Sequence, residues 1–267
     1  MMICKDDLNK IAIIAKDNKV TYNELFSSIN QYSQLFQGNG YKKIAIYSEN
    51  RPEWIYSFYS GWQNECIVVP VDYMASAEDV TFILNDCQPE LIFTSQGQKA
   101  ELERIMVGLN YKPEVFCFGE IGLPQVTNPT RTIEPKNTEN TAVIIYTSGT
   151  TGSPKGVMLS YKNLIANVNG VSKEVVIFTP ERQVLILLPL HHIFPLAGSL
   201  MAPLMVGGTV VLAPSMQSSD LMETLKNNQI AIMIGVPRLY ELIYKGIKAK
   251  IDVSFAARTL FKIVRLT

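Results

Sequence analysis

The chain has 267 residues, and its 24 basic and 24 acidic side chains give a formal net charge of zero. This balance argues against a protein that mainly binds nucleic acid and against a polybasic membrane anchor. With 47% hydrophobic and 18% charged residues, the chain is expected to fold rather than to be disordered. Its length suits one large α/β domain or two small ones.

The first part of the chain predicts strands and helices in alternation. The strands are short apolar runs between turn residues: Ile11–Ala15, Lys19–Thr21, Lys43–Tyr47, Cys66–Val71, Glu90–Thr94 and Val115–Phe118. Thr21 and Glu24 fit a capping box, so a helix is predicted to begin there and to stop at Gly38. Further helices are predicted after Pro52, after Ser76 and near 98–109.

The later part of the chain follows a connector. Residues 119–140 are rich in Pro, Thr, Asn and Gly, and the alternation resumes with a strand over 141–147. We therefore predict a first α/β subdomain over 1–118, a connector over 119–140 and a second α/β segment over 141–267. Such alternation indicates stacked, mostly parallel sheets covered by helices.

One uncharged run requires a test for a membrane span. No Asp, Glu, Lys or Arg occurs from Gln183 to Ser219, and a spanning helix needs about 20 apolar residues. Pro189, Pro195 and Pro203 interrupt the run, as does the Gly207-Gly208 pair. It divides better into a buried strand (184–188), a helix (195–206) and a second strand (209–212).

The four cysteines form no C-x-x-C pair, and only two histidines are present, so a structural zinc site is not expected. The first ten residues have no long apolar run, so a signal peptide is not expected. Reduced thiols in a cytoplasmic protein are the simplest interpretation.

The most informative stretch is YTSGTTGSPKGV, residues 146–157. After an apolar strand, residues 147–153 contain five hydroxyl side chains and two glycines. Glycines let backbone N–H groups approach an anion closely, and hydroxyls donate further hydrogen bonds. Lys155 adds a positive charge. The order therefore predicts a cradle for a polyphosphate. It is not a Walker A loop, because two residues separate Gly152 from Lys155.

This string resembles the phosphate-binding signature of the adenylate-forming superfamily, which includes acyl-CoA synthetases, adenylation domains of peptide synthetases, and luciferases. Other segments resemble that family too: TYNEL (21–25), the 43–54 segment ending in Pro-Glu-Trp, IVVPVD (67–72), LPLHHIF (188–194) and VPRLY (236–240). The histidine motif is similar to the acyl-CoA synthetase form. The 236–240 segment and the residues after it most resemble long-chain fatty acyl-CoA ligases.

The resemblance implies an αβαβα-type large N-terminal domain and a site for ATP. The residues implied to wrap its β- and γ-phosphates are Thr147, Ser148, Gly149, Thr150, Thr151 and Gly152. Lys155 is implied to neutralise the departing pyrophosphate, and Mg²⁺ is implied to bridge the phosphates near the hydroxyls of Thr147 and Thr151. CoA is the implied acyl acceptor.

The substrate side of the implied site centres on His192, which is expected beside the carboxylate and the α-phosphate. Together with Lys155 and Thr147 it is a candidate catalytic residue. Phe194 and the 232–235 wall, including Gly235, are candidates for the acyl pocket, with ordinary core packing as the alternative. His191 is expected to be only a packed neighbour.

Motifs of the family's downstream half do not occur in this sequence, among them Y-G-x-T-E, T-G-D and the catalytic lysine of the small C-terminal domain. The chain therefore resembles an incomplete large domain, and we expect little adenylation from it alone. The leading hypothesis is activation of a long-chain fatty acid to acyl-CoA, with AMP and pyrophosphate released. An aryl or medium-chain acid and a non-catalytic ATP-binding fragment stay open. A fatty-acid substrate would be compatible with peripheral contact at the inner face of a membrane, whereas the oligomeric state is open.

Overall fold

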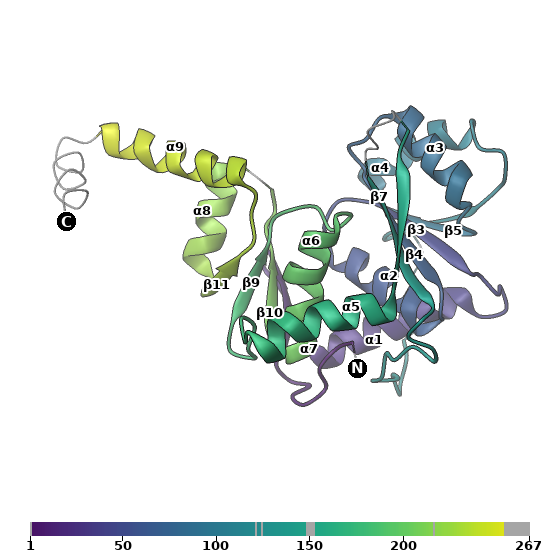
Figure 1. Cartoon of the computed structure of the whole chain (residues 1–267), viewed down its shortest axis with the longest axis horizontal. Helices are drawn as coiled ribbons and strands as arrows, with labels where there is room; N and C mark the ends of the chain where they lie inside the picture. Colours follow the sequence, from purple (N-terminus) through teal and green to yellow (C-terminus); the bar gives the residue numbers. More distant parts are fainter. Residues whose placement is uncertain (1, 121, 124, 148–152, 216, 254–267) are drawn as a thin grey trace.

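The computed structural model describes residues 2–120, 122–123, 125–147, 153–215 and 217–253, and its strands form two sheets (Figure 1). Sheet A has five strands, in the order β11 (Ile230–Met233), β9 (Gln183–Ile186), β10 (Thr209–Leu212), β1 (Ile11–Ala15) and β2 (Asn18–Thr21). Sheet B has six, in the order β6 (Glu114–Cys117), β5 (Leu91–Thr94), β3 (Lys43–Tyr47), β4 (Ile67–Val71), β7 (Thr141–Thr147) and β8 (Lys155–Ser160). All neighbours are parallel except β1–β2 and β7–β8.

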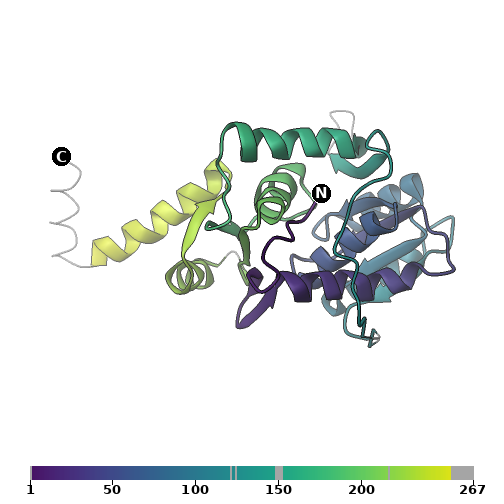
Figure 2. The same cartoon turned by 90° about the horizontal axis from the view of Figure 1, so that it is seen from below.

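Helices cover both sheets. Four contribute to the core that the sheets share: α1 (Tyr22–Ser33), α2 (Pro52–Gln63), α5 (Tyr161–Asn169) and α7 (Ala202–Val206). Two cover the outer face of sheet B: α3 (Ala77–Cys87) and α4 (Gln96–Met106). Two contribute to the outer cluster of sheet A: α8 (Ser218–Asn227) and α9 (Pro237–Val253), with α9 reaching away from the body (Figures 1 and 2). The predicted stacked α/β architecture is confirmed.

Most of the strands are apolar on both sides because both of their faces are buried; the edge strand β8 is an exception, with Val157 and Met158 exposed. In β3, Ile44 and Ile46 join the shared core, whereas Ala45 and Tyr47 face α3 and α4. This alternation is the period of two that a strand imposes, and parallel strands covered on both faces carry near-continuous apolar sequence. The shared core also holds Trp54 and Trp62, which are almost fully buried.

Two predicted helix starts are confirmed. The hydroxyl of Thr21 accepts a hydrogen bond from the Glu24 N–H, and the Glu24 carboxylate accepts one from the Thr21 N–H, which completes the capping box. Ser76 caps α3 by accepting from the Asp79 N–H.

The uncharged 183–219 run forms a strand, a helical segment and a strand, as predicted. The helical segment begins at Ile193, not at residue 195. It combines α6 (Ile193–Pro195), the π-helical η3 (Leu196–Met201) and α7. Pro195 and Pro203 lack N–H donors, so a regular α-helical ladder cannot run through the whole segment. No helix in the described ranges is long and apolar enough to cross a membrane.

The two sheets interleave along the sequence. Residues 11–21 belong to sheet A, the strands from 43 to 160 build sheet B, and residues 183–233 return to sheet A. The division at 119–140 into two subdomains stays a prediction about folding units. Shorter elements complete the described chain: a 3-10 helix at Gln34–Phe36 and a π-helical turn at Gly170–Glu174.

Candidate active site

The segment predicted to bind phosphate connects two antiparallel strands, β7 and β8. In their register Thr147 lies opposite Lys155, so the two ends of the 148–154 connection are directly paired. Both side chains are exposed. Ser148–Gly152 lie outside the described residues, and their predicted contacts with phosphate stay predictions. The hairpin nevertheless brings the predicted lysine and the first predicted hydroxyl to one point at the edge of sheet B.

Gly156 in this hairpin is required by its cross-strand neighbour Tyr146. A Cβ at Gly156 would lie 2.9 Å from Ile144 Cγ2 and 3.1 Å from Tyr146 Cζ, so a side chain would displace the ring. The Tyr146 hydroxyl donates to Asp86 Oδ2 at 2.5 Å. The glycine of the Pro-Lys-Gly sequence thus lets Tyr146 lie flat against β8, with its hydroxyl held by α3.

A cavity of about 530 Å³ opens beside the hairpin; because its lining includes several polar side chains, it is called the polar cavity below. Residues from three separate segments line it. They are Pro70, Asp72, Ala75, Asp79 and Ile83 from β4 through α3, Tyr146, Thr147 and Pro154 from the hairpin, and His191 and His192 after β9. The carboxyl ends of parallel strands meet at one edge of a sheet, which is where α/β proteins bind ligands. The cavity therefore has the size and position of a small-molecule site.

The two histidines of the chain contact each other at this cavity. Their Nε2 atoms are 3.2 Å apart, and their ring centroids are 4.1 Å apart. His191 is buried and His192 is exposed. Asp72 Oδ2 lies 3.6 Å from His191 Nε2. Burial lowers the pKa of His191 to about 4; the Asp72 carboxylate opposes this shift and His192 adds to it. His191 is therefore neutral at physiological pH.

Asn50 holds the backbone just before the histidines. Its side-chain amide donates to the Leu188 carbonyl at 2.9 Å and accepts from the Leu190 N–H at 3.0 Å. These bonds explain why β9 ends at Ile186 rather than at the predicted residue 188: the backbone here pairs with a side chain from the turn between β3 and α2 and not with a strand. The loop after β9 is thereby fastened to the end of β3.

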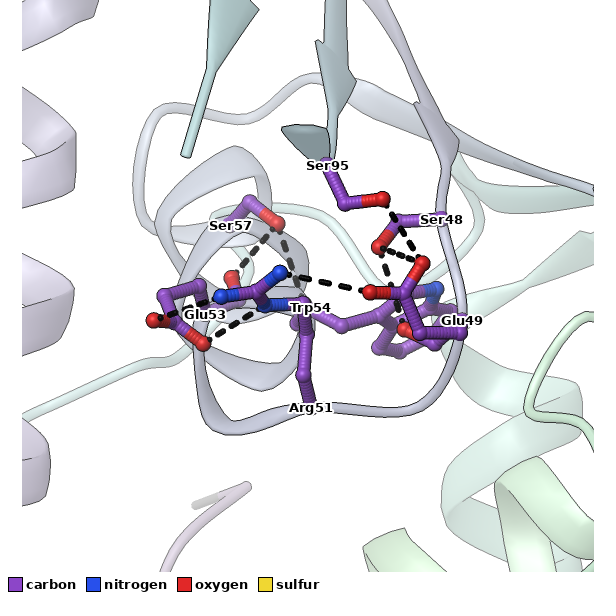
Figure 3. A network of polar contacts seen from close by, with 7 residues as sticks. All are labelled: Ser48, Glu49, Arg51, Glu53, Trp54, Ser57 and Ser95. Carbon is purple, nitrogen blue, oxygen red and sulfur yellow. Dashed lines mark hydrogen bonds and ion pairs between the residues drawn. The ribbon is translucent and has the colours of Figure 1, made fainter. Parts of the chain in front are cut away.

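A charged network fixes the turn that carries Asn50 (Figure 3). Arg51 bonds Glu53 through two nitrogens, at 2.9 and 3.1 Å, and its third bond reaches Glu49 at 3.3 Å. Glu49 also accepts from the Ser95 hydroxyl at 2.7 Å, which ties the turn to the end of β5. Although burial opposes its charge, the bonds from Arg51 hold the pKa of Glu53 below its ordinary value.

A second cavity, of about 560 Å³, is lined in part by Ile193 and Phe194, which directly follow the two histidines. Its lining is largely apolar: Leu159, Asn163, Leu164, Asn167, Val171, Ile177, Phe178, Ile193, Phe194, Ala197, Gly198, Ile232 and Ile234. No described residue that lines it carries a charge. Phe194, predicted for an acyl pocket, lines it together with Ile232 and Ile234 of the predicted wall. Gly235 is not in that lining; a Cβ there would meet Leu239 and Tyr240 of α9.

Four of the sequence-predicted residues lie around these two cavities. Thr147 and His192 line the polar cavity, Lys155 lies opposite Thr147, and Phe194 lines the apolar cavity. Sequence reasoning missed Asn50 and Asp72. The available signal was their position shortly after strands β3 and β4: Asn50 is three residues after the end of β3, and Asp72 is the residue after β4. The carboxyl ends of parallel strands gather at this edge.

Magnesium was predicted near the hydroxyls of Thr147 and Thr151. Thr151 lies outside the described residues, and Thr147 offers an exposed hydroxyl oxygen at the polar cavity. No cluster of three or more His, Cys, Asp or Glu side chains suited to a metal occurs in the part of the chain that the structure describes. This donor set fits Mg²⁺ held mainly by substrate phosphates and water, because Mg²⁺ rarely uses an all-protein cage.

Comparison with known proteins matches the chain to the family described as AMP-binding enzyme over residues 4–265. A peroxisomal long chain acyl-CoA synthetase of Arabidopsis thaliana is 31% identical, over 86% of this chain and 35% of that protein. A mitochondrial malonate–CoA ligase of Homo sapiens is 26% identical, over 87% of this chain and 42% of that protein. The chain therefore spans less than half the length of these relatives.

Solved structures give the same result for the fold. An o-succinylbenzoate coenzyme A synthetase from Bacillus subtilis in complex with AMP superimposes with a TM-score of 0.76 and 25% identity. The match covers 89% of this chain and 61% of that one. The named relatives act on different acids, so relatedness alone leaves the acid class open.

Proposed function

The chain belongs to the AMP-binding enzyme family, and from that premise we propose that it serves the ATP-dependent ligation of a carboxylic acid to CoA. In the first step a carboxylate oxygen attacks the α-phosphorus of ATP, and pyrophosphate leaves with the electron pair of the broken P–O bond. In the second step the CoA thiol attacks the acyl carbonyl, loses its proton, and expels AMP. The product is the acyl-CoA thioester.

One observation carries this proposal: the 191–194 segment contributes side chains to both cavities. His191 and His192 line the polar cavity beside the hairpin, whereas Ile193 and Phe194 line the apolar cavity. An acid with an apolar body can place its carboxylate at His192 and its chain against Phe194. The same carboxylate then faces the side on which ATP would lie. Adenylation of an apolar acid requires this arrangement, in which the carboxylate lies beside ATP and the apolar chain lies away from it.

Lys155 and Thr147 are the described residues best placed for the phosphates. An exposed lysine opposite a hydroxyl can bind a polyphosphate as a point charge and a hydrogen-bond donor. Magnesium, when bound with ATP, would neutralise part of the phosphate charge. His192 would donate a hydrogen bond to the carboxylate or to the α-phosphate as negative charge develops there.

The acid is proposed to be a long-chain fatty acid. The 560 Å³ cavity has no charged residue in its described lining, and a short dicarboxylic acid such as malonate would bring a second carboxylate into it without a partner. An apolar chain meets no such penalty. The 31% identity to a long chain acyl-CoA synthetase supports the same class.

The test is pyrophosphate release from Mg-ATP with palmitate, malonate, coumarate or acetate. It is run on this chain and on a version extended with its natural downstream sequence to the length of the relatives. We expect turnover from the extended protein, fastest with palmitate. Turnover with malonate alone would overturn the acid class. ATP binding without pyrophosphate release from either protein would overturn the ligase proposal in favour of a binding fragment.

Two substitutions distinguish the role of the ATP side from that of the acid side in this assay. Lys155→Ala is expected to weaken ATP binding without changing the KM for the acid, and Phe194→Ala to raise the KM for the acid without changing ATP binding. Lys162→Ala is the matched control for the lysine, because Lys162 is exposed on α5 and pairs with Glu139 at 2.7 Å. Equal effects of the two lysine substitutions would contradict the assigned role of Lys155.

The cytoplasmic location and peripheral membrane contact stay predictions. Two of the relatives are described as peroxisomal and mitochondrial enzymes. A long-chain acid partitions into membranes, so the proposed substrate would bring the protein to a membrane surface during turnover.

A further inference from the structure

The contact between the two histidine rings is a hydrogen bond in which one Nε2–H donates to the other Nε2. At 3.2 Å, one Nε2 must carry the hydrogen and the other must accept it, because two Nε2–H groups would repel. His191 is buried and neutral, so it carries a proton on one nitrogen only. The tautomer of one histidine therefore determines the tautomer of the other.

Asp72 decides which histidine donates. Its carboxylate lies 3.6 Å from the same His191 Nε2 that contacts His192. A negative charge near a ring nitrogen favours the proton on that nitrogen. His191 is thus the Nε2–H tautomer and donates to His192 Nε2. His192 then carries its own proton on Nδ1, and Nδ1–H is the donor that it offers to a ligand.

Asn50 fixes where this pair sits. Its two hydrogen bonds hold the backbone on both sides of Pro189, at Leu188 and at Leu190. The turn that presents Asn50 is itself held by Arg51 and Glu49 (Figure 3). The histidines follow a strand of sheet A, yet both groups that orient them come from the end of sheet B.

We propose that Asp72 and Asn50 are positioning residues: Asp72 sets the tautomer of His192 through His191, and Asn50 fixes the segment that carries both rings. The consequence for catalysis rests on the proposed function, in which His192 meets the substrate carboxylate. A ring nitrogen that accepts from His191 cannot also take a proton from the substrate side, so His192 acts as a hydrogen-bond donor through Nδ1 and not as a base through Nε2.

The chain offers a direct test, because it contains only two histidines. Long-range ¹H–¹⁵N spectra of the ¹⁵N-labelled chain at pH 7.5 report which ring nitrogen is protonated, and His192→Gln assigns the two rings. We expect Nε2–H for His191 and Nδ1–H for His192. Nδ1–H for His191, or Nε2–H for His192, would overturn the proposal.

Asp72→Asn removes the charge and keeps the size of the side chain. We expect the tautomer ratio of His192 to move roughly two- to tenfold toward Nε2–H, the range that one net hydrogen bond produces. Asp79→Asn is the matched control, since Asp79 and Tyr146 are the other titratable groups that face the cavity besides Asp72 and the histidines. Identical spectra for the two carboxylate variants would refute the role of Asp72.

Asn50 is tested by the same spectra. Asn50→Ala removes both backbone bonds and should broaden or shift the His192 resonances, whereas Asn50→Asp keeps the acceptor for the Leu190 N–H and should restore them in part. Unchanged His192 resonances in Asn50→Ala would refute its role. None of these readouts needs turnover. If the tautomers are as predicted but neither this chain nor the extended protein releases pyrophosphate, only the proposed function is overturned. If the extended protein releases pyrophosphate but the tautomers differ from those predicted, only this inference is overturned.

Discussion

The outer layers of the two sheets have the same design but differ in burial. On sheet B, α3 and α4 cover parallel strands and bury Val80, Leu84 and Leu102 almost completely. On sheet A, α8 and α9 cover parallel strands too, but Leu221 and Leu239 are their only described apolar side chains buried as deeply. Tyr240, Tyr244 and Ile247 of α9 are 43–50% exposed.

The difference shows that amphipathic helices on parallel strands do not by themselves make a stable layer. What separates the layers is how much apolar surface each removes from water, at about 25 cal/mol per Å². We therefore expect sheet B with its two covers to be the stable part of the molecule. The α8–β11–α9 layer should open at lower free energy.

The largest expected contrast is between two aliphatic side chains in these layers. Leu84→Ala leaves a cavity under α3, where the side chain is fully buried, and should cost about 2–5 kcal/mol of unfolding free energy. Ile247→Ala removes a side chain that is 43% exposed and improves helix propensity, so it should change stability by less than about 1 kcal/mol. Urea denaturation of both variants measures the contrast. Equal losses would mean that the layers are equally buried in solution.

A second test measures how the unfolding free energy depends on pH, which reports on His191 between the two sheets. The folded-state pKa of His191 is about 4, against an ordinary value of 6.5. Between these values the unfolded chain takes up a proton that the folded chain does not, so this contribution to stability is complete above pH 6.5 and is lost as pH falls toward 4. From pH 7 to pH 5 the loss should be about 2 kcal/mol.

His191→Gln isolates this effect, because glutamine stays neutral over the range. The variant should lose less stability between pH 7 and pH 5 than the parent chain, and His192→Gln should keep most of the loss. Carboxylates such as Glu53, whose pKa is lowered, contribute mainly below this window. A pH slope that is the same in His191→Gln and in the parent would show that His191 is not buried as a neutral ring.

Much of the fold could be predicted from sequence because local signals and burial agree there. The capping box at Thr21 and the cap at Ser76 involve residues three apart, and strands buried on both faces are nearly uninterrupted apolar runs. The strand before the phosphate loop, predicted over 141–147, was equally visible because it is an apolar run, whereas its antiparallel pairing with β8 was not predicted. The family resemblance stated from these segments is confirmed by the match over residues 4–265.

The parts that escaped prediction depend on contacts between distant segments. Asn50 and Leu190 are 140 residues apart, and no local pattern indicates that an amide will replace a strand as the partner of residues 188 and 190. The π-helical stretch within 193–206 was missed for a different reason: Pro195 and Pro203 were visible, but the hydrogen-bond register that replaces the regular α-helical ladder depends on packing. The separation of the polar and apolar cavities is likewise a property of the assembled sheets.

The last and smallest expected effect compares two crowded glycines. A Cβ at Gly61 of α2 would lie 2.5 Å from Ile44 Cδ1 and 2.9 Å from Val68 Cγ2, between a helix and the middle of sheet B. Overpacking there costs about 1–3 kcal/mol, and the helical preference for alanine returns up to about 1, so Gly61→Ala should destabilise by about 1–2 kcal/mol. Thermal and urea denaturation measure it.

A Cβ added at Gly198 of η3 would be equally crowded, because it would lie 2.5 Å from Ile234 Cδ1. That atom is the end of a flexible side chain that lines the apolar cavity, so it can move into open space. Gly198→Ala should therefore leave stability within about 0.5 kcal/mol or raise it slightly. It should also narrow the cavity and favour shorter acids over palmitate. If Gly198→Ala destabilised as much as Gly61→Ala, the packing around the cavity would be as tight as sheet B, and the proposed room for an acyl chain would be wrong.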